Sequence, residues 1–164
     1  MSKLMMPIWI LMVVALAASS LRAQSQPEWR GYGYVYGGAI GGDNGSGYTV
    51  GGGGDGLVYK GVSVGGDVAL LAPGSRWNRS FGAASVNGGY HFTNASSDGK
   101  FVPFVTAGPT AFFGDGVGVG FNVGGGANYW FKERLGARFE FRTHVPGNSD
   151  LQAFYGFRVG LTFR

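Results

Sequence analysis

Glu140, His144 and Ser149 are residue types that a hydrolytic site uses, and they lie close together in the sequence. In an extended strand Glu140 and His144 would share one face but stand about 13 Å apart, at ~3.3 Å per residue. That separation is too long for the hydrogen bond that orients a catalytic histidine. Ser149 falls in the segment Pro-Gly-Asn-Ser-Asp, where asparagine and serine are expected in any turn. The three residues therefore favour a structural role, with hydrolytic chemistry as an alternative.

The glycine run 51–56 carries a second chemical motif, because Gly51, Gly53 and Gly56 match the GxGxxG spacing of dinucleotide-binding loops. Such a site requires a helix after the glycines, and no helical pattern follows here. A strand that bends where a narrow barrel closes explains the same glycines. The chain has no cysteine, only two distant histidines and no closely spaced carboxylates. We therefore expect no cofactor and no metal site.

Charged residues within the predicted strands form a balanced set of three arginines, two aspartates and one glutamate. Charges that are removed from bulk water need partners of opposite sign. An eight-stranded barrel is just wide enough for its own side chains to fill. We predict that these residues pair and close the interior of such a barrel; they are Asp55, Asp67, Arg138, Glu140, Arg142 and Arg158.

The segment 135–145 positions half of this set, and it alternates as a strand does. In a membrane barrel its apolar face would meet lipid and its charged face the lumen, whereas a soluble barrel would invert both. A charge at Phe141 should therefore be harmful, and Gly136→Ser, on the polar face near a rim, should be mild. The apolar face carries Leu135, Ala137, Phe139, Phe141, Thr143 and Val145, and the polar face carries Gly136, Arg138, Glu140, Arg142 and His144.

Seven further segments resemble this one and are separated by short turns rich in Gly, Asp, Asn and Pro. Each is roughly 10 to 15 residues long, enough to span a bilayer as a tilted strand. An even number of strands places both chain ends on one side, together with turns 60–61, 94–100 and 132–134. The sequence predicts an all-β, eight-stranded antiparallel up-and-down transmembrane β-barrel, with strands at 29–41, 48–59, 62–70, 81–92, 101–113, 117–131, 135–145 and 151–163.

Four further features of these strands concern individual residues. Tyr32, Tyr34 and Tyr36 share a face, but tyrosine suits either a lumen or a lipid interface. The aromatic run 129–131 is typical of an interfacial girdle. Pro109 lacks a backbone donor and predicts a bulge or local distortion, and His91 is expected to hydrogen-bond at a rim.

Residues 1–23 are predicted to be a signal peptide, which leaves residues 24–164 as one barrel domain. Lys3 supplies the positive start, and the apolar stretch 4–18 is shorter than the ~20 residues of a spanning helix. We favour cleavage between Ala23 and Gln24, with a site after Ser19 or Ser20 as an alternative. After Ala23 there are 11 Lys and Arg against 9 Asp and Glu. These basic residues are dispersed along the sequence, which gives a nucleic-acid partner little support.

The mature chain resembles the small outer-membrane β-barrel family of OmpA/OmpX type. The resemblance rests on the leader, the alternating segments, Phe101-Val-Pro-Phe-Val-Thr-Ala-Gly, Phe121-Asn-Val-Gly-Gly-Gly-Ala-Asn-Tyr-Trp-Phe and the last strand. It implies a monomer in the bacterial outer membrane, surrounded by lipid and lipopolysaccharide. In the family the insertion machinery reads a C-terminal pattern that ends on an aromatic residue, whereas here Arg164 follows. The residues that match the pattern are Tyr155, Phe157, Val159, Leu161 and Phe163.

The predicted function is a non-enzymatic structural or surface-interaction role in the outer membrane. One alternative is a lipid-modifying outer-membrane enzyme, although the His-x-Ser-Asn spacing of the barrels that deacylate lipid is absent. The other is a secreted soluble barrel that binds a small apolar ligand. The polar face of residues 135–163 has many glycines and no lysine, which suits a crowded lumen better than a solvent-exposed surface.

Overall fold

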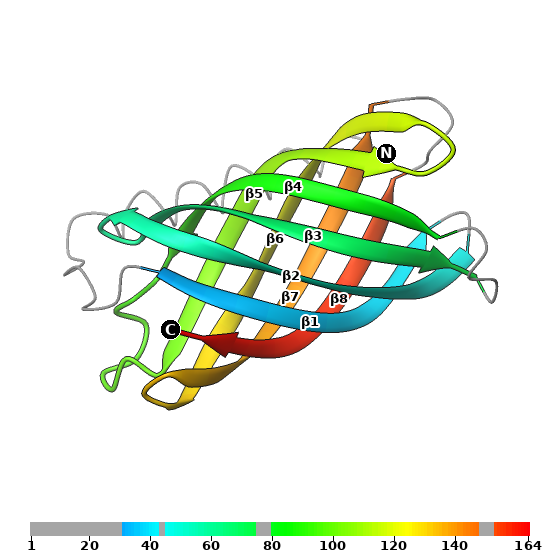
Figure 1. The fold of residues 1–164 in the computed structure, drawn as a ribbon. Helices are drawn as coiled ribbons and strands as arrows, with labels where there is room; N and C mark the ends of the chain where they lie inside the picture. Colours follow the sequence, from blue (N-terminus) through cyan, green and yellow to red (C-terminus); the bar gives the residue numbers. More distant parts are fainter. Residues whose placement is uncertain (1–30, 43–44, 75–79, 148–152) are drawn as a thin grey trace, which may run out of the picture.

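The computed structural model describes residues 31–42, 45–74, 80–147 and 153–164, and within them the chain forms a closed eight-stranded barrel (Figure 1). Each strand pairs antiparallel with its neighbours in the chain, and β1 closes the ring by pairing with β8. The strands are β1 (Gly31–Gly42), β2 (Gly45–Tyr59), β3 (Val62–Pro73), β4 (Phe81–His91), β5 (Phe101–Phe113), β6 (Val117–Lys132), β7 (Leu135–Pro146) and β8 (Phe154–Phe163).

This topology confirms the predicted up-and-down barrel. The start of β1 and the end of β8 lie side by side, with Gly33 opposite Phe163. We call this the terminal end of the barrel; it also holds the turns after β2, β4 and β6. The boundaries differ slightly from the predicted ones, since β2 starts earlier and β4 stops at His91. The predicted start of the last strand, 151–152, and the whole predicted leader lie outside the described residues.

The β2–β3 connection shows how local sequence fixes one hairpin. Lys60 and Gly61 form a two-residue turn, and both have positive φ, 40° and 88°. Positive φ at both central positions characterises the type I′ turn, whose twist matches the twist of the flanking strands. Glycine adopts this backbone without steric cost. The turn pairs Tyr59 with Val62, and a register shift between Leu57 and Tyr59 then offsets the rest of β2 by one residue.

Pro109 distorts the sheet locally, as predicted. It keeps its place opposite Phe121 on β6, but on the β4 side the pairing stops between Ser85–Thr110 and Gly88–Ala107. The neighbouring Gly108 carbonyl accepts a hydrogen bond from the Asn122 side chain, at 2.9 Å, inside the barrel. The Asn122 side-chain amide therefore satisfies a backbone carbonyl next to the gap in the β4–β5 hydrogen bonding.

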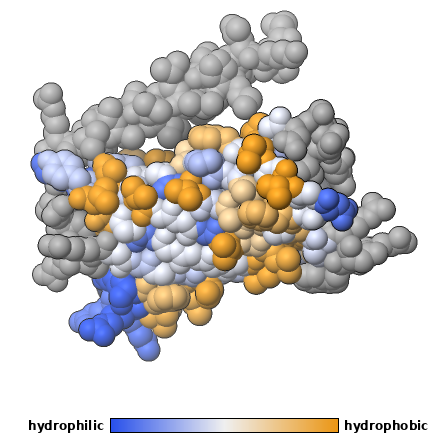
Figure 2. Space-filling model, turned by 45° about the horizontal axis from the view of Figure 1, so that its top comes forward, coloured by the Kyte–Doolittle hydropathy of each residue, from blue (hydrophilic) through white to orange (hydrophobic). Residues whose placement is uncertain are grey.

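The barrel wall is apolar outside and polar inside. On β7, for example, Phe139 and Phe141 are 45% and 51% exposed, whereas Arg138 and Glu140 are 2% and 1% exposed. On the face drawn in Figure 2, patches of hydrophobic surface lie along the outside of the wall. The arrangement is the reverse of a soluble domain and matches the membrane-barrel alternative. No helix in the described part of the chain is long and apolar enough to cross a membrane.

The interior is filled by large side chains placed beside glycines. Tyr34 and Tyr36 of β1 face inward, opposite Gly53 and Gly51 of β2. A Cβ at Gly51 would stand 2.6 Å from the Tyr36 hydroxyl, closer than van der Waals contact allows. Gly51 of the GxGxxG spacing therefore makes room for Tyr36, and Gly53 makes room for Asp67 of β3. Alternation of large and small residues fits a narrow barrel.

The predicted aromatic girdle needs one correction, because Trp130 is not part of it. Its neighbours Tyr129 and Phe131 face outward, each 47% exposed, as a girdle requires. Trp130 instead points into the lumen and is only 2% exposed. The alternation of β6 decides this, since neighbouring side chains on a strand must face opposite ways.

Candidate functional site

The lumen is the place where polar side chains converge, and all six charged residues predicted for it point inward. Arg138, Glu140 and Arg142 follow one another along the inner face of β7. Their cross-strand neighbours include Gly124 and Gly126 on β6 and Gly156 and Gly160 on β8. These glycines leave the long charged side chains room to extend across the narrow interior.

Glu140 is the centre of this cluster. One carboxylate oxygen accepts hydrogen bonds from Arg138 Nε and Nη2, at 3.0 and 2.8 Å. The other accepts from Arg142 Nε at 2.5 Å. Arg158 lies farther away, with Nη1 at 3.7 Å from the same oxygen. A single carboxylate therefore faces three guanidinium groups.

Asp67 of β3 is a second centre, on the opposite wall. It accepts a hydrogen bond from Arg142 Nη1, at 2.5 Å, and lies 3.6 Å from Arg158 Nη1. The Tyr36 hydroxyl and the Asn87 side-chain amide also donate to it, at 3.2 and 3.1 Å. Asp67 thus joins β7 and β8 to β1 and β4 across the lumen.

Arg138 extends the cluster toward the terminal end. Its Nη1 donates to the Tyr32 hydroxyl at 2.9 Å, and Tyr32 in turn donates to Asp55 at 2.6 Å. The direct distance from Arg138 to Asp55 is 4.0 Å. The guanidinium also lies over the rings of Phe104 and Tyr34, at 3.9 and 4.2 Å from their centroids. Such stacking is favourable for a desolvated arginine.

Aromatic groups lie at both ends of the charged cluster. At the terminal end the Tyr32 ring contacts His91 and Trp130, with centroids 5.5 and 6.1 Å apart. At the far end Phe154 stacks on His144 at 4.8 Å and packs against Phe112 at 6.0 Å. The charged cluster therefore has aromatic rings near each of its ends.

His91 lies at the end of β4, as predicted, but its side chain is 1% exposed and faces the lumen. Its Nε2 is 3.4 Å from the Tyr32 hydroxyl.

Within the described residues, the side chains considered for hydrolysis do not form a catalytic site. Glu140 is bonded to two arginines, and His144 Nε2 faces Arg158 at 3.1 Å. Ser149 lies outside the described residues. The glycine motif lies within β2, where a strand rather than a helix continues. Within the described ranges no three His, Asp or Glu residues are grouped as a metal site requires.

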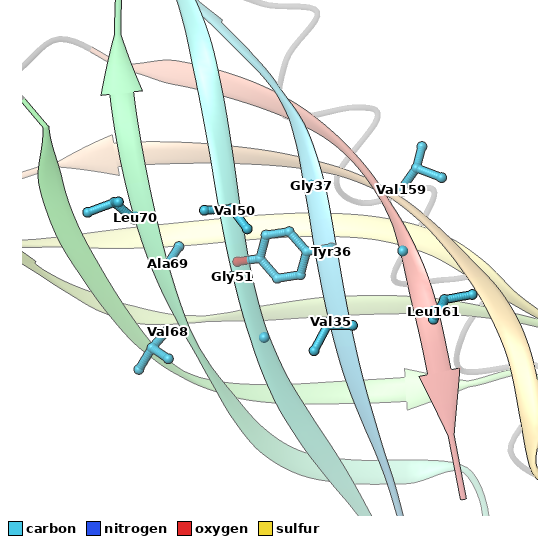
Figure 3. Close-up of a pocket in the computed structure, with 12 residues that line it drawn as sticks. Val35, Tyr36, Gly37, Val50, Gly51, Val68, Ala69, Leu70, Val159 and Leu161 are labelled. Carbon is cyan, nitrogen blue, oxygen red and sulfur yellow. The ribbon is translucent and has the colours of Figure 1, made fainter. Parts of the chain in front are cut away.

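An open hollow of about 650 Å³ lies on the outer wall across β8, β1, β2 and β3 (Figure 3). Gly37 and Gly52 face outward there and present no side chain. Its apolar rim includes Val35, Val50 and Leu161, all exposed. Because the surrounding side chains are apolar, this hollow offers no catalytic group.

The predicted insertion pattern occupies the outer face of β8. All five residues are exposed, from 42% to 53%, and alternate with inward-facing Gly156, Arg158 and Thr162. Arg164 follows the strand, and its Nε donates to the Glu133 carbonyl at 2.6 Å. The outward residues are Tyr155, Phe157, Val159, Leu161 and Phe163.

Several polar partners were not included in the predicted network; they are Tyr32, Tyr36, Asn87, Asn122, Asn128 and His144. The tyrosines had an undecided facing, and the structure places both inside. Asn122 donates to Asn87 at 2.9 Å, which links it to Asp67. Alternation along β4 and β6 identifies the inward face of both asparagines, but it cannot identify their partners across the lumen.

Solved structures similar to this chain include bacterial β-barrels and a designed transmembrane β-barrel. The N-terminal β-barrel domain of Pseudomonas aeruginosa OprF matches with a TM-score of 0.62 at 16% identity, covering 82% of this chain and 96% of that one. Neisserial surface protein A matches with a TM-score of 0.62 at 13% identity, covering 81% and 95%. A designed transmembrane β-barrel matches with a TM-score of 0.63 at 20% identity, covering 86% and 98%. No protein-family model and no curated protein sequence matches the chain. The similarity confirms the resemblance at the level of the fold, an eight-stranded transmembrane barrel.

Proposed function

We propose that the chain is an integral outer-membrane β-barrel with a structural or surface-interaction role, without enzymatic activity and with a lumen closed by its ionic network. The observation that carries this proposal is the exposed apolar belt around a charged interior. Large apolar side chains 42% to 73% exposed occur on all eight strands. In water such a surface would cause association, whereas in a bilayer it faces its preferred solvent.

The closed lumen is supported by the packing of the charges. Arg138, Glu140 and Arg142 are each at most 2% exposed, and they bond to one another or to residues across the barrel. Aromatic rings lie at both ends of the cluster. An interior of this width leaves little room for a conducting path once its side chains are paired.

A non-enzymatic role is supported by the state of the candidate groups. Glu140 accepts hydrogen bonds from two arginines, so it is poorly placed to act as a base. His144 is buried against Arg158 and Phe154.

The proposal includes export by the predicted leader 1–23 and recognition of β8 by the barrel-insertion machinery. It also includes a monomer surrounded by outer-membrane lipid and lipopolysaccharide. The apolar alternation on β8 supports the insertion step.

Cell fractionation combined with heat-modifiable gel migration tests the location. We expect the protein in the outer-membrane fraction, resistant to carbonate extraction, with a faster-migrating folded form before boiling. Recovery in the soluble periplasm would contradict the proposal.

A labelling experiment tests the orientation of the wall. The cysteine-free chain allows one fluorophore at Phe141→Cys on the outer face of β7 and, in a second protein, at Asp115→Cys in the exposed β5–β6 turn. Lipids with bromine on their tails should quench the label at position 141 and spare the one at 115. Equal, weak quenching at both positions would show that this face does not meet lipid.

A further inference from the structure

The two ends of the barrel differ in charge. The turns and chain end on the terminal side carry Lys60, Lys100, Lys132, Arg134 and Arg164 against Asp98 and Glu133, a side-chain sum of +3. Within the described residues, the segments that join strands at the opposite end carry Asp115 and no lysine or arginine, a sum of −1. The terminal end is therefore the basic end.

Folding gathers most of these basic residues into one sector. The Trp130 amide donates to the Lys100 carbonyl at 2.8 Å, which joins the β4–β5 loop to the end of β6. The Arg164 amide donates to the Arg134 carbonyl at 3.2 Å, which joins the chain after β8 to the β6–β7 turn. We call Lys100, Lys132, Arg134 and Arg164 the basic sector. Residues dispersed along the sequence thus become neighbours on one rim.

Within the basic sector, Lys100 has an acidic partner nearby, whereas Lys132 and Arg134 form no ion pair in the described chain. Lys100 Nζ lies 3.8 Å from Asp98. The Lys100 backbone N–H donates to the Asp98 carboxylate and holds the pKa of that group below its ordinary value, so Asp98 stays charged. Lys132 and Arg134 are exposed and form no ion pair within the described chain. Their positive charges are the ones presented to a partner.

Outward-facing aromatic residues lie directly beside this sector. Phe101 follows Lys100, and Phe131 precedes Lys132; they are 45% and 47% exposed. Figure 2 shows a strongly hydrophilic cluster at one end of the barrel next to hydrophobic surface. Aromatic belts mark the level where hydrocarbon gives way to headgroups, and Lys and Arg stems reach outward from that level.

We propose that the basic sector binds the phosphate groups of anionic glycerophospholipids in the leaflet on the terminal side. This inference rests on the proposed function, since it needs the barrel in a bilayer. Lys132 and Arg134 lie just beyond outward-facing Phe131, so in a bilayer they would reach lipid phosphates, and each would contribute attraction to an anionic surface. The guanidinium of Arg134 suits phosphate oxygens, because its N–H groups match their spacing.

Lipid retention by the full protein tests this inference. The protein is extracted from membranes in neutral detergent and equilibrated with equal amounts of phosphatidylglycerol and phosphatidylcholine, and bound lipids are counted by native mass spectrometry. We expect preferential retention of phosphatidylglycerol. Lys132→Gln with Arg134→Gln should reduce that preference by roughly 10- to 30-fold at low salt, at about fivefold per charge.

Two matched variants sharpen the test. Lys132→Arg with Arg134→Lys keeps both charges and should keep the preference, and Glu133→Gln removes the neighbouring acid and should strengthen it. Equal retention of both lipids by the native protein, or an unchanged preference in the double glutamine variant, would overturn the inference. Folding is checked first by heat-modifiable migration. A chain that does not insert into membranes contradicts the proposed function as well, whereas an inserted barrel without lipid preference contradicts only this inference.

Discussion

The two faces of β7 lie on one strand and meet opposite surroundings. On the inner face Arg138, Glu140 and Arg142 are 1% to 2% exposed, and on the outer face Phe139 and Phe141 are 45% and 51% exposed. In a soluble domain, burying the charged side chains and exposing the aromatic rings to water would both cost free energy. Here the buried residues are the polar ones, because the interior supplies hydrogen-bonding and ionic partners for them. The exposed aromatic rings face the apolar interior of the bilayer. Stability therefore depends on which face a residue occupies more than on whether it is buried.

The largest expected effect comes from breaking the inner face at Glu140. Glu140→Leu would leave Arg138 and Arg142 without their shared carboxylate, and we expect a loss of about 3–5 kcal/mol in the free energy of unfolding. Urea unfolding in lipid vesicles, followed by tryptophan fluorescence, measures this loss. The matched control is Glu133→Leu in the exposed β6–β7 turn, where the change should be small. Equal stability of the two variants would contradict the buried network.

On the outer face, Phe141→Arg places a charge among lipid tails. We expect a cost of about 2–4 kcal/mol if the residue lies near the bilayer midplane. The yield of folded protein in vesicles measures it, with Phe141→Leu as the control that keeps the position apolar. Folding of the arginine variant to the same yield as the leucine variant would argue against a lipid-facing surface here.

Glycine-to-alanine substitutions test the same two faces of the wall, with a smaller expected effect on stability. Gly53 faces inward, and an added Cβ would stand 2.7 Å from the Asp67 Cβ, whereas at outward-facing Gly37 the nearest atom is 3.9 Å away. We expect Gly53→Ala to destabilise the barrel by about 1–3 kcal/mol through overpacking. Gly37→Ala should stay within about 0.5 kcal/mol of the native protein. Thermal melting of both variants checks the difference, and a reversed order would exclude this packing explanation.

Gly136 faces inward, as the sequence predicts, but its surroundings lead us to expect that Gly136→Ser destabilises the barrel, contrary to the mild effect predicted from the sequence. A Cβ at Gly136 would lie 2.6 Å from the Tyr129 carbonyl oxygen and 3.1 Å from the Trp130 ring. Nearness to a rim does not relieve this crowding, because the contact is with the backbone of the neighbouring strand.

The smallest effect is expected at the exposed pair of Asp98 and Lys100. Both side chains are 55% exposed and stand 3.8 Å apart, so water screens their attraction. Asp98→Asn should leave the urea unfolding midpoint unchanged at physiological salt. A clear shift in that midpoint would show that this rim pair contributes more than its exposure suggests.

The fold could be predicted because alternation is a local property. The inward facing of Arg138, Glu140 and Arg142 follows from the strand period alone. Their partners do not, because Arg142 reaches Asp67 75 residues away and the match depends on how the strands tilt in the closed barrel. The facing of Tyr32, Tyr34 and Tyr36 was undecided for a similar reason, since tyrosine is compatible with either environment.

The seam between β1 and β8 has a consequence for assembly. Every other pairing joins strands that are adjacent in the chain, so its contacts are close in sequence. Contacts such as Arg138 with Tyr32, 106 residues apart, require the two ends of the sheet to meet. An unclosed sheet would carry unpaired arginines and carboxylates beside open strand edges, a costly state within a bilayer. Closure and ion pairing should therefore occur in one cooperative step, and partly closed sheets should be too sparsely populated to accumulate during folding.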